Sequence, residues 1–205
     1  MDFEIPSWDN IEKYLIELAK KIAPLRNKIE IIVCIWRGGA FPSRLLSDFL
    51  NIHTVCNICV DYYDDIQKRK EFPVITQTIS TDIEGKNVLV CDDVSDSGNS
   101  LIQVQNYLKQ RNCASIRTAT IYIKPWTKFR PDFYVKETTL WIIFPWERIE
   151  TLEKLNRKYL KQGKSLEELR GELLSAGFPQ RILDFYYSTK MNRKTPRNLF
   201  NGKEN

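Results

Sequence analysis

The residues with the clearest potential for chemistry lie in one stretch near the middle of the chain, Val88–Leu101. Four apolar residues lead into Asp92 and Asp93, and a turn of small, mostly hydroxylated residues follows before a helical pattern begins. In open α/β sheets, ligands bind at the carboxyl ends of strands, and a turn that presents backbone N–H groups before a helix binds phosphate. The stretch therefore predicts a phosphate-binding turn beside paired carboxylates.

The individual side chains narrow the choice of ligand. Gly98 permits close approach of the backbone, and Ser97 and Ser100 offer hydroxyl donors. Asp92 and Asp93 repel a phosphate, but they can accept hydrogen bonds from vicinal sugar hydroxyls. We therefore expect a ligand that carries both a phosphate and a diol. The phosphate motifs GxxxxGK[ST] and GxGxxG do not occur in the sequence.

A second segment, Ile35-Trp36-Arg37-Gly38-Gly39, has the composition of a polyanion-binding loop. The Arg37 guanidinium can hold a phosphate through two hydrogen bonds. The two glycines leave backbone N–H groups open to the same anion. An ordinary strand-ending turn is the alternative interpretation.

These segments resemble a known family. Residues 88–100 follow the phosphoribosyl pyrophosphate signature of type I phosphoribosyltransferases: four apolar residues, two acids and two variable residues before Asp-Thr/Ser-Gly-x-Thr/Ser. The resemblance runs from about residue 5 to 147 and is greatest to the archaeal and bacterial purine enzymes. It implies the α/β type I phosphoribosyltransferase fold, with a central mostly parallel sheet flanked by helices and, here, a helical C-terminal extension.

The resemblance also implies roles for the two loops. Asp92 and Asp93 would bind the ribose hydroxyls, and Asp93 would share in binding magnesium. Asp96 would be the acid/base that faces N7 of a purine, and Arg37 would neutralise the leaving pyrophosphate after a cis peptide bond, Trp36–Arg37. The full sets are Asp96, Ser97, Gly98, Asn99 and Ser100 for the 5′-phosphate, and Arg37, Gly38 and Gly39 for pyrophosphate.

Further segments carry implied roles at the base and the metal. Lys124 would donate a hydrogen bond to the exocyclic oxygen of a 6-oxopurine, because an ammonium group has donors and no acceptor. Trp141 would stack on the base, and the backbone of Ile142 would meet its edge. Glu147 lies near a position where relatives hold an acid beside the metal.

Residues 61–72 correspond to the mobile loop that covers the active site in this family. The family often has a Ser-Tyr pair there, whereas this chain has Asp61-Tyr62-Tyr63. A solvated charged loop without a role is the alternative interpretation. The candidates for closing over the substrate are Tyr62, Tyr63, Lys68 and Arg69.

The implied reaction is displacement at ribose C1. Pyrophosphate leaves phosphoribosyl pyrophosphate, a purine nitrogen attacks, and a purine nucleoside 5′-monophosphate forms, with Mg²⁺ as cofactor. Lys124 favours hypoxanthine, guanine or xanthine, but the C-terminal extension resembles that of crenarchaeal adenine phosphoribosyltransferases. We expect adenine as the base and AMP as the product, with the 6-oxopurines as the alternative.

Two other protein classes stay open as alternatives. One is a non-catalytic regulator that senses phosphoribosyl pyrophosphate or a nucleotide, but such a protein would be free to lose Asp96, Arg37 and Lys124. The other is a flavodoxin-like receiver or phosphatase domain. That class places its paired acids after the first strand, whereas Asp92 and Asp93 lie in the middle of the chain.

The elements that must position these residues follow an alternating pattern of strands and helices, which is typical of a parallel sheet with crossover helices. The expected strands are Ile29–Ile35, His53–Val60, Asn87–Cys91, Ser115–Ile123 and Leu140–Phe144, and the expected helices lie between Ser7 and Pro24, at 40–50 and at 100–111. After Glu147 the chain becomes charged and helical. We expect a phosphoribosyltransferase domain over 1–147, a helical extension over 148–189 and a flexible basic tail over 190–205.

Composition sets the remaining limits. A chain of 205 residues suits one α/β domain with a modest appendage. No apolar run approaches the roughly 20 residues of a membrane span, so we expect a cytoplasmic protein, and relatives suggest a homodimer. The net charge of +5 lies mostly in the tail, which argues against a nucleic-acid-binding face. The five cysteines and single histidine do not complete a zinc site, so we expect buried thiols.

Overall fold

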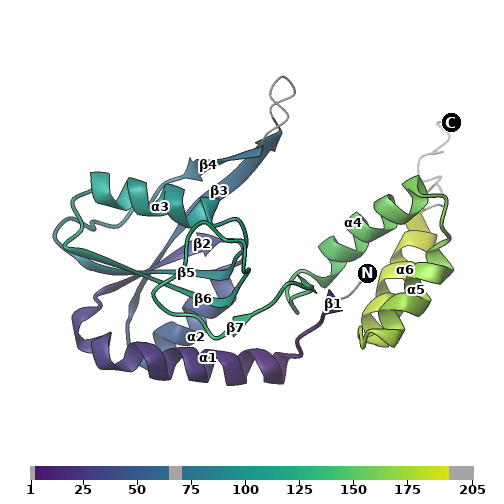
Figure 1. Ribbon diagram of the computed structural model, residues 1–205, viewed down its shortest axis with the longest axis horizontal. Coiled ribbons are helices and arrows are strands. Elements are labelled where there is room, and N and C mark those ends of the chain that lie inside the picture. Colours follow the sequence, from purple (N-terminus) through teal and green to yellow (C-terminus); the bar gives the residue numbers. More distant parts are fainter. Residues whose placement is uncertain (1–2, 65–70, 194–205) are drawn as a thin grey trace, which may run out of the picture. The chain divides into compact units, whose positions relative to one another are not determined.

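A computed structural model describes residues 3–64 and 71–193, and the chain in it forms two compact units. We call Asp9–Thr139 the sheet unit (Figure 1). We call the other, in which Met1–Trp8 joins Leu140–Asn205, the terminal unit. Within the described ranges, no helix is both long and apolar enough to cross a membrane.

The sheet unit is built on a six-stranded sheet with the order β4-β3-β2-β5-β6-β7. Its pairs are parallel, except that β3 and β4 are antiparallel. The prediction of a mostly parallel sheet is therefore confirmed. The strands are β2 (Ile31–Trp36), β3 (Thr54–Asp64), β4 (Glu71–Gln77), β5 (Asn87–Ser95), β6 (Ser115–Ile123) and β7 (Lys136–Glu137).

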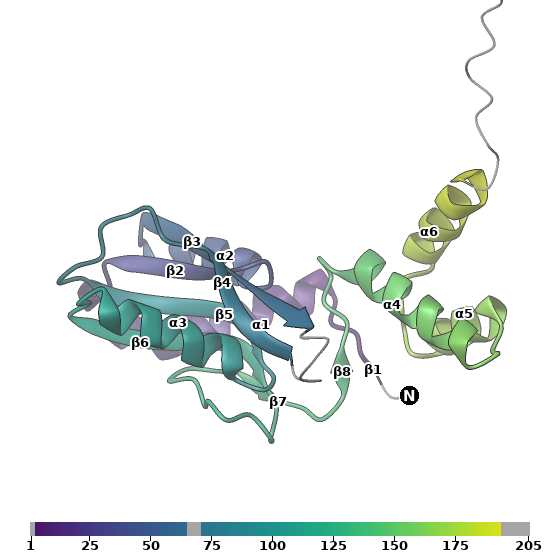
Figure 2. The same ribbon diagram turned by 90° about the horizontal axis from the view of Figure 1, so that it is seen from above.

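Helices cover both faces of this sheet (Figures 1 and 2). On one face lie α1 (Trp8–Ile22), which continues into a 3₁₀ helix (Ala23–Lys28), and α2 (Ala40–Leu50). On the other lies α3 (Asn99–Gln110), whose Leu101, Val104 and Leu108 are buried in one cluster with apolar residues of β2, β3 and β5. Because β2 and β5 are covered on both faces, their sequences contain runs of consecutive apolar residues.

One strand is longer than the sequence predicts, and residues 61–72, expected to be an exposed loop or ribbon, lie partly in a ribbon. Strand β5 continues past the paired acids to Ser95, because Asp92 and Ser95 pair with Thr120 and Ile123 of β6. Residues 61–72, which show no strand period, lie partly in a β3–β4 ribbon, where Tyr62 pairs with Pro73. An exposed ribbon at a sheet edge buries neither face fully, so its sequence does not alternate.

The terminal unit combines the first strand with the last helices. β1 (Phe3–Glu4) pairs in parallel with β8 (Trp141–Ile142). The helices are α4 (Arg148–Lys161), α5 (Leu166–Ser175) and α6 (Gln180–Arg193). They bury a second apolar cluster that includes Ile143 and Leu173, with Phe3 and Ile5 packed against it.

The two units do not divide the chain at the predicted domain boundary. Residues 140–147 cluster with the last helices, and the boundary at Glu147 stays a prediction. The last helix runs to Arg193, past the predicted start of the tail at 190, because the first helix-breaking residue after it is Pro196. Residues 194–205 lie outside the described part of the chain. A capping box between Ser165 and Glu168 begins α5.

The expectation of buried thiols holds for three of the five cysteines. Cys34, Cys56 and Cys91 are buried, and burial raises the pKa of Cys56 to about 11 and that of Cys34 to about 12. Cys59 and Cys113 are partly exposed. In the described ranges, His, Cys, Asp and Glu side chains form no group of three that could hold a metal ion.

Candidate active site

The predicted pyrophosphate loop, which follows β2, lies beside the paired acids of β5. Strands β2 and β5 are parallel neighbours with Cys34 opposite Cys91, so the residues that follow both strands emerge at the same edge. A Cβ atom at Gly38 would lie 2.4 Å from a carboxylate oxygen of Asp93. The peptide bond Trp36–Arg37 is cis, as predicted. The two loops therefore form one continuous lining.

Gly39 is required by close packing at this edge. A Cβ atom there would lie 2.3 Å from the carbonyl oxygen of Cys91 and 2.7 Å from that of Ile35. The Gly39 N–H donates to the Ile35 carbonyl over 2.8 Å, and α2 begins at the next residue. A side chain at this position would therefore push the loop away from β5.

The predicted phosphate turn connects β5 to α3. Gly98 has a φ of +79°, and a Cβ atom there would lie 2.6 Å from the Phe129 backbone nitrogen. The turn bounds a cleft of about 190 Å³ at the N-terminus of α3, where free N–H groups and the helix dipole favour an anion. The cleft is lined by Tyr62, Asp92, Asp93, Val94, Ser95, Asp96, Ser97, Gly98, Ser100 and Leu101. The structure therefore brings the predicted ribose and phosphate residues together.

Burial and a neighbouring carboxylate determine the electrostatics at Asp92 in the cleft. Burial, and then the charge of Asp93, raise the pKa of Asp92 well above its usual range. The Asp93 N–H donates to Asp92 Oδ1 over 2.9 Å, which offsets part of this cost. Such a pair favours ligands that bring positive charge or hydroxyl donors, and Mg²⁺ beside a sugar diol offers both.

Replacing Asp92 by Asn is expected to raise the thermal midpoint of the ligand-free protein near pH 7. A raised native pKa means that the folded protein binds more protons than the unfolded chain, so stability falls as pH rises through the interval between the two pKa values. The variant should lose this part of the pH dependence and should bind phosphoribosyl pyrophosphate more weakly. Thermal melts from pH 4 to 8 test the idea, and an unchanged pH slope would contradict it.

The predicted base-binding lysine lies beside the phosphate turn. Lys124 follows β6 and is 5% exposed. Its backbone N–H donates to the Ser95 carbonyl over 3.0 Å. Its ammonium group lies 5.5 Å from the centre of the Trp126 ring. The indole N–H of Trp126 donates to Asp96 Oδ1 over 2.8 Å. The sequence analysis assigned no role to Trp126, although a tryptophan two residues after a candidate lysine was a signal that could have been used.

Three of the remaining predicted residues are not part of the sheet unit. Trp141, Ile142 and Glu147 belong to the terminal unit: Ile142 is buried, Trp141 is 39% exposed, and Glu147 directly precedes α4. Their roles stay predictions.

The structure describes two of the four residues predicted to close over the substrate. The hydroxyl of Tyr62 shares a 2.8 Å hydrogen bond with Ser100 Oγ, which places this tyrosine over the phosphate turn. Tyr63 lies next to it in β3. Lys68 and Arg69 fall outside the described residues.

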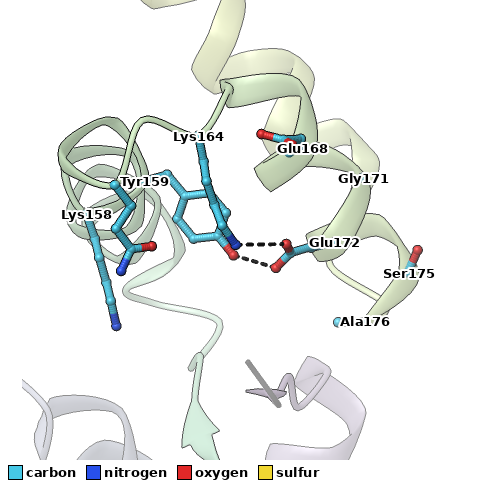
Figure 3. A pocket seen from close by; sticks show the side chains of 9 residues that line it. Lys158, Tyr159, Lys164, Glu168, Gly171, Glu172, Ser175 and Ala176 are labelled. Atoms are coloured by element: carbon cyan, nitrogen blue, oxygen red, sulfur yellow. Dashed lines mark hydrogen bonds and ion pairs between the residues drawn. The ribbon is translucent and has the colours of Figure 1, made fainter.

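A larger groove of about 880 Å³ lies in the terminal unit between α4 and α5 (Figure 3). Glu172 accepts a hydrogen bond from the Tyr159 hydroxyl, which raises the pKa of Tyr159 to about 12, and it lies 3.9 Å from Lys164 Nζ. Lys158 and Glu168 also line the groove. Its two basic and two acidic side chains balance, so the groove offers no net attraction to a phosphate.

Comparison with known proteins places the chain in a family. Residues 4–149 match the model of the phosphoribosyl transferase domain. A xanthine-guanine phosphoribosyltransferase of Idiomarina loihiensis is 30% identical over 143 residues, which cover 69% of this chain and 84% of that protein.

Solved structures agree with this match. A purine phosphoribosyltransferase from Pyrococcus horikoshii is 37% identical with a TM-score of 0.64, over 71% of this chain and 94% of that chain. A xanthine-guanine-hypoxanthine phosphoribosyltransferase of Helicobacter pylori is 26% identical with a TM-score of 0.62, over 74% and 99%. With the two loops at one sheet edge and the match over most of its length, this chain belongs to the phosphoribosyl transferase domain family.

Proposed function

We propose that this chain transfers 5-phosphoribosyl from phosphoribosyl pyrophosphate to a 6-oxopurine and releases pyrophosphate. The observation that carries the choice of base is the buried Lys124 beside the Asp96 turn. A lysine ammonium has three donors and no acceptor, so it suits the O6 atom of xanthine, guanine or hypoxanthine and not the 6-amino group of adenine.

The expectation of adenine is not supported. It rested on the likeness of the C-terminal helices to those of adenine enzymes, and none of the relatives described above is named for adenine. Two of them are named for xanthine and guanine, which agrees with the chemistry of Lys124.

In the proposed reaction, the chain acts mainly by positioning and by stabilising charge. The N–H groups at the start of α3 hold the 5′-phosphate, and Asp92 and Asp93 accept from the ribose hydroxyls. Arg37 neutralises the leaving pyrophosphate, and Asp96 handles the proton at purine N7. The cleft fits Mg²⁺, because carboxylates together with substrate oxygens are its preferred ligands; Asp93 would hold it, and it would supply charge neutralisation when bound.

The test of the proposed function is a base panel. Initial rates are measured with xanthine, guanine, hypoxanthine and adenine at saturating phosphoribosyl pyrophosphate and Mg²⁺. We expect pyrophosphate release with at least one 6-oxopurine and a kcat/KM for adenine lower by about 100-fold or more. Faster turnover of adenine would reverse the assignment of the base, and an inactive protein that still binds phosphoribosyl pyrophosphate would favour the regulator.

Replacing Arg37 by Ala is expected to weaken binding of pyrophosphate by about 10-fold and to leave nucleoside monophosphate binding nearly unchanged. The reason is that the Arg37 loop follows β2, whereas the 5′-phosphate turn follows β5. Calorimetric titration with each ligand measures the two effects. Equal losses for both ligands would show that Arg37 does not serve the leaving group.

A further inference from the structure

Burial in the core does not account for the presence of a tryptophan at position 126. It is 55% exposed, so it adds little to the core, and a tryptophan kept for burial would be largely covered. Its indole N–H nevertheless donates to Asp96 Oδ1 over 2.8 Å. Among the described residues, Trp126 is the one whose side chain hydrogen-bonds the Asp96 carboxylate.

Neighbouring hydrogen bonds hold the turn that carries Trp126 in place. The Lys128 N–H donates to the Ser97 carbonyl over 3.1 Å, and Ser95 Oγ donates to the Phe129 carbonyl over 2.8 Å. Ser95 Oγ also pairs with the Thr127 hydroxyl over 2.8 Å. The turn is therefore tied to both ends of the segment that holds Asp96, and the indole N–H is presented from a fixed backbone.

We propose that Trp126 is a positioning residue that fixes the orientation of the Asp96 carboxylate; this rests on the proposed function, in which Asp96 faces purine N7. An exposed carboxylate rotates freely about its terminal bond. The indole N–H occupies Oδ1 and has no acceptor to offer, so Oδ2 is left for the proton at N7. Trp126 thereby sets which oxygen meets the base.

The same ring also reaches the second base-recognition residue. The Lys124 ammonium lies 5.5 Å from the ring centre, within the range of a cation–π contact. N7 and O6 lie on one edge of a 6-oxopurine. Because one indole touches both Asp96 and Lys124, it sets the spacing of the two groups that read this edge.

The experiment compares two substitutions of Trp126. Trp126→Phe removes the N–H and keeps a ring for Lys124, and we expect kcat to fall about 10-fold with unchanged KM for phosphoribosyl pyrophosphate and unchanged thermal midpoint. Trp126→Leu removes the ring as well, and we expect KM for the base to rise in addition.

The matched control is Tyr107→Phe on α3. The Arg111 guanidinium lies 5.9 Å from the centre of the Tyr107 ring, so the variant keeps a ring beside a cation, as Trp126→Phe does. The Tyr107 hydroxyl accepts a hydrogen bond from Arg111 over 3.2 Å. This variant loses one hydrogen bond to a charged group, as Trp126→Phe does, and should keep its kcat.

A spectroscopic measurement tests the hydrogen bond without relying on activity. The chain has five tryptophans, so protein labelled with ¹⁵N-tryptophan should give five indole signals, and Trp126→Phe identifies one of them. We expect that signal to shift in Asp96→Ala.

The outcomes distinguish the positioning role of Trp126 from the role of Asp96 in the proposed function. A stationary indole signal, or a Trp126→Phe kcat within twofold of wild type, overturns the positioning role. If Asp96→Asn is slow in that case, the proposed function stands; if Asp96→Asn is as fast as wild type, the role of Asp96 in the proposed function fails.

Discussion

Replacing Asp96 by Asn is expected to lower kcat by about 10²-fold or more, while phosphoribosyl pyrophosphate still binds. The amide keeps the shape of the carboxylate and can still accept from Trp126, but it cannot take a proton from purine N7. Because Asp96 is exposed, the substitution should leave the fold unchanged.

Steady-state rates combined with calorimetric binding of phosphoribosyl pyrophosphate check this result. Asp48→Asn on α2 is the control, because it makes the same exchange at an exposed carboxylate that does not line the cleft. Turnover of Asp96→Asn close to that of the wild type would refute the acid/base role, and loss of phosphoribosyl pyrophosphate binding would assign Asp96 to the phosphate site alone.

Replacing Lys124 by Ala is expected to reduce kcat/KM for a 6-oxopurine by about 10- to 150-fold, the range for a hydrogen bond to a charged group. In the proposed function the ammonium donates to O6, and the substitution removes this donor. Rates with adenine, which has no O6, should fall much less.

Lys124→Met separates the charge from the packing of this buried side chain, because methionine fills a similar volume. We expect Lys124→Met to lose as much kcat/KM as Lys124→Ala while keeping more thermal stability. A methionine variant that still turns over the 6-oxopurine at the wild-type rate would show that Lys124 does not read the base.

The sheet could be predicted for a physical reason. Parallel strands buried on both faces are rich in consecutive apolar residues, so β2 and the first half of β5 were located from their apolar runs, and Asp92 and Asp93 marked the carboxyl edge. The turn could also be predicted, because a glycine at a positive φ and the helix that follows it depend on local sequence alone.

Other features depend on contacts that sequence order does not reveal. The segment 61–72 shows no strand period, although part of it lies in the β3–β4 ribbon. The contact between Trp126 and Asp96 joins residues 30 positions apart through the register of β5 and β6. The grouping of residues 140–147 with the last helices depends on the cluster around Ile143, which also needs Phe3 from the far end of the chain.

That grouping has a consequence for the order in which the protein can assemble during its synthesis. The sheet unit is continuous, so all of its strands are available once residue 139 has left the ribosome. The first strand, Phe3–Glu4, is made before any of them, yet its partner Trp141–Ile142 appears only after the sheet is complete. Phe3 and Glu4 must therefore wait for partners that lie 138 positions later in the chain, and the terminal unit closes after the sheet unit.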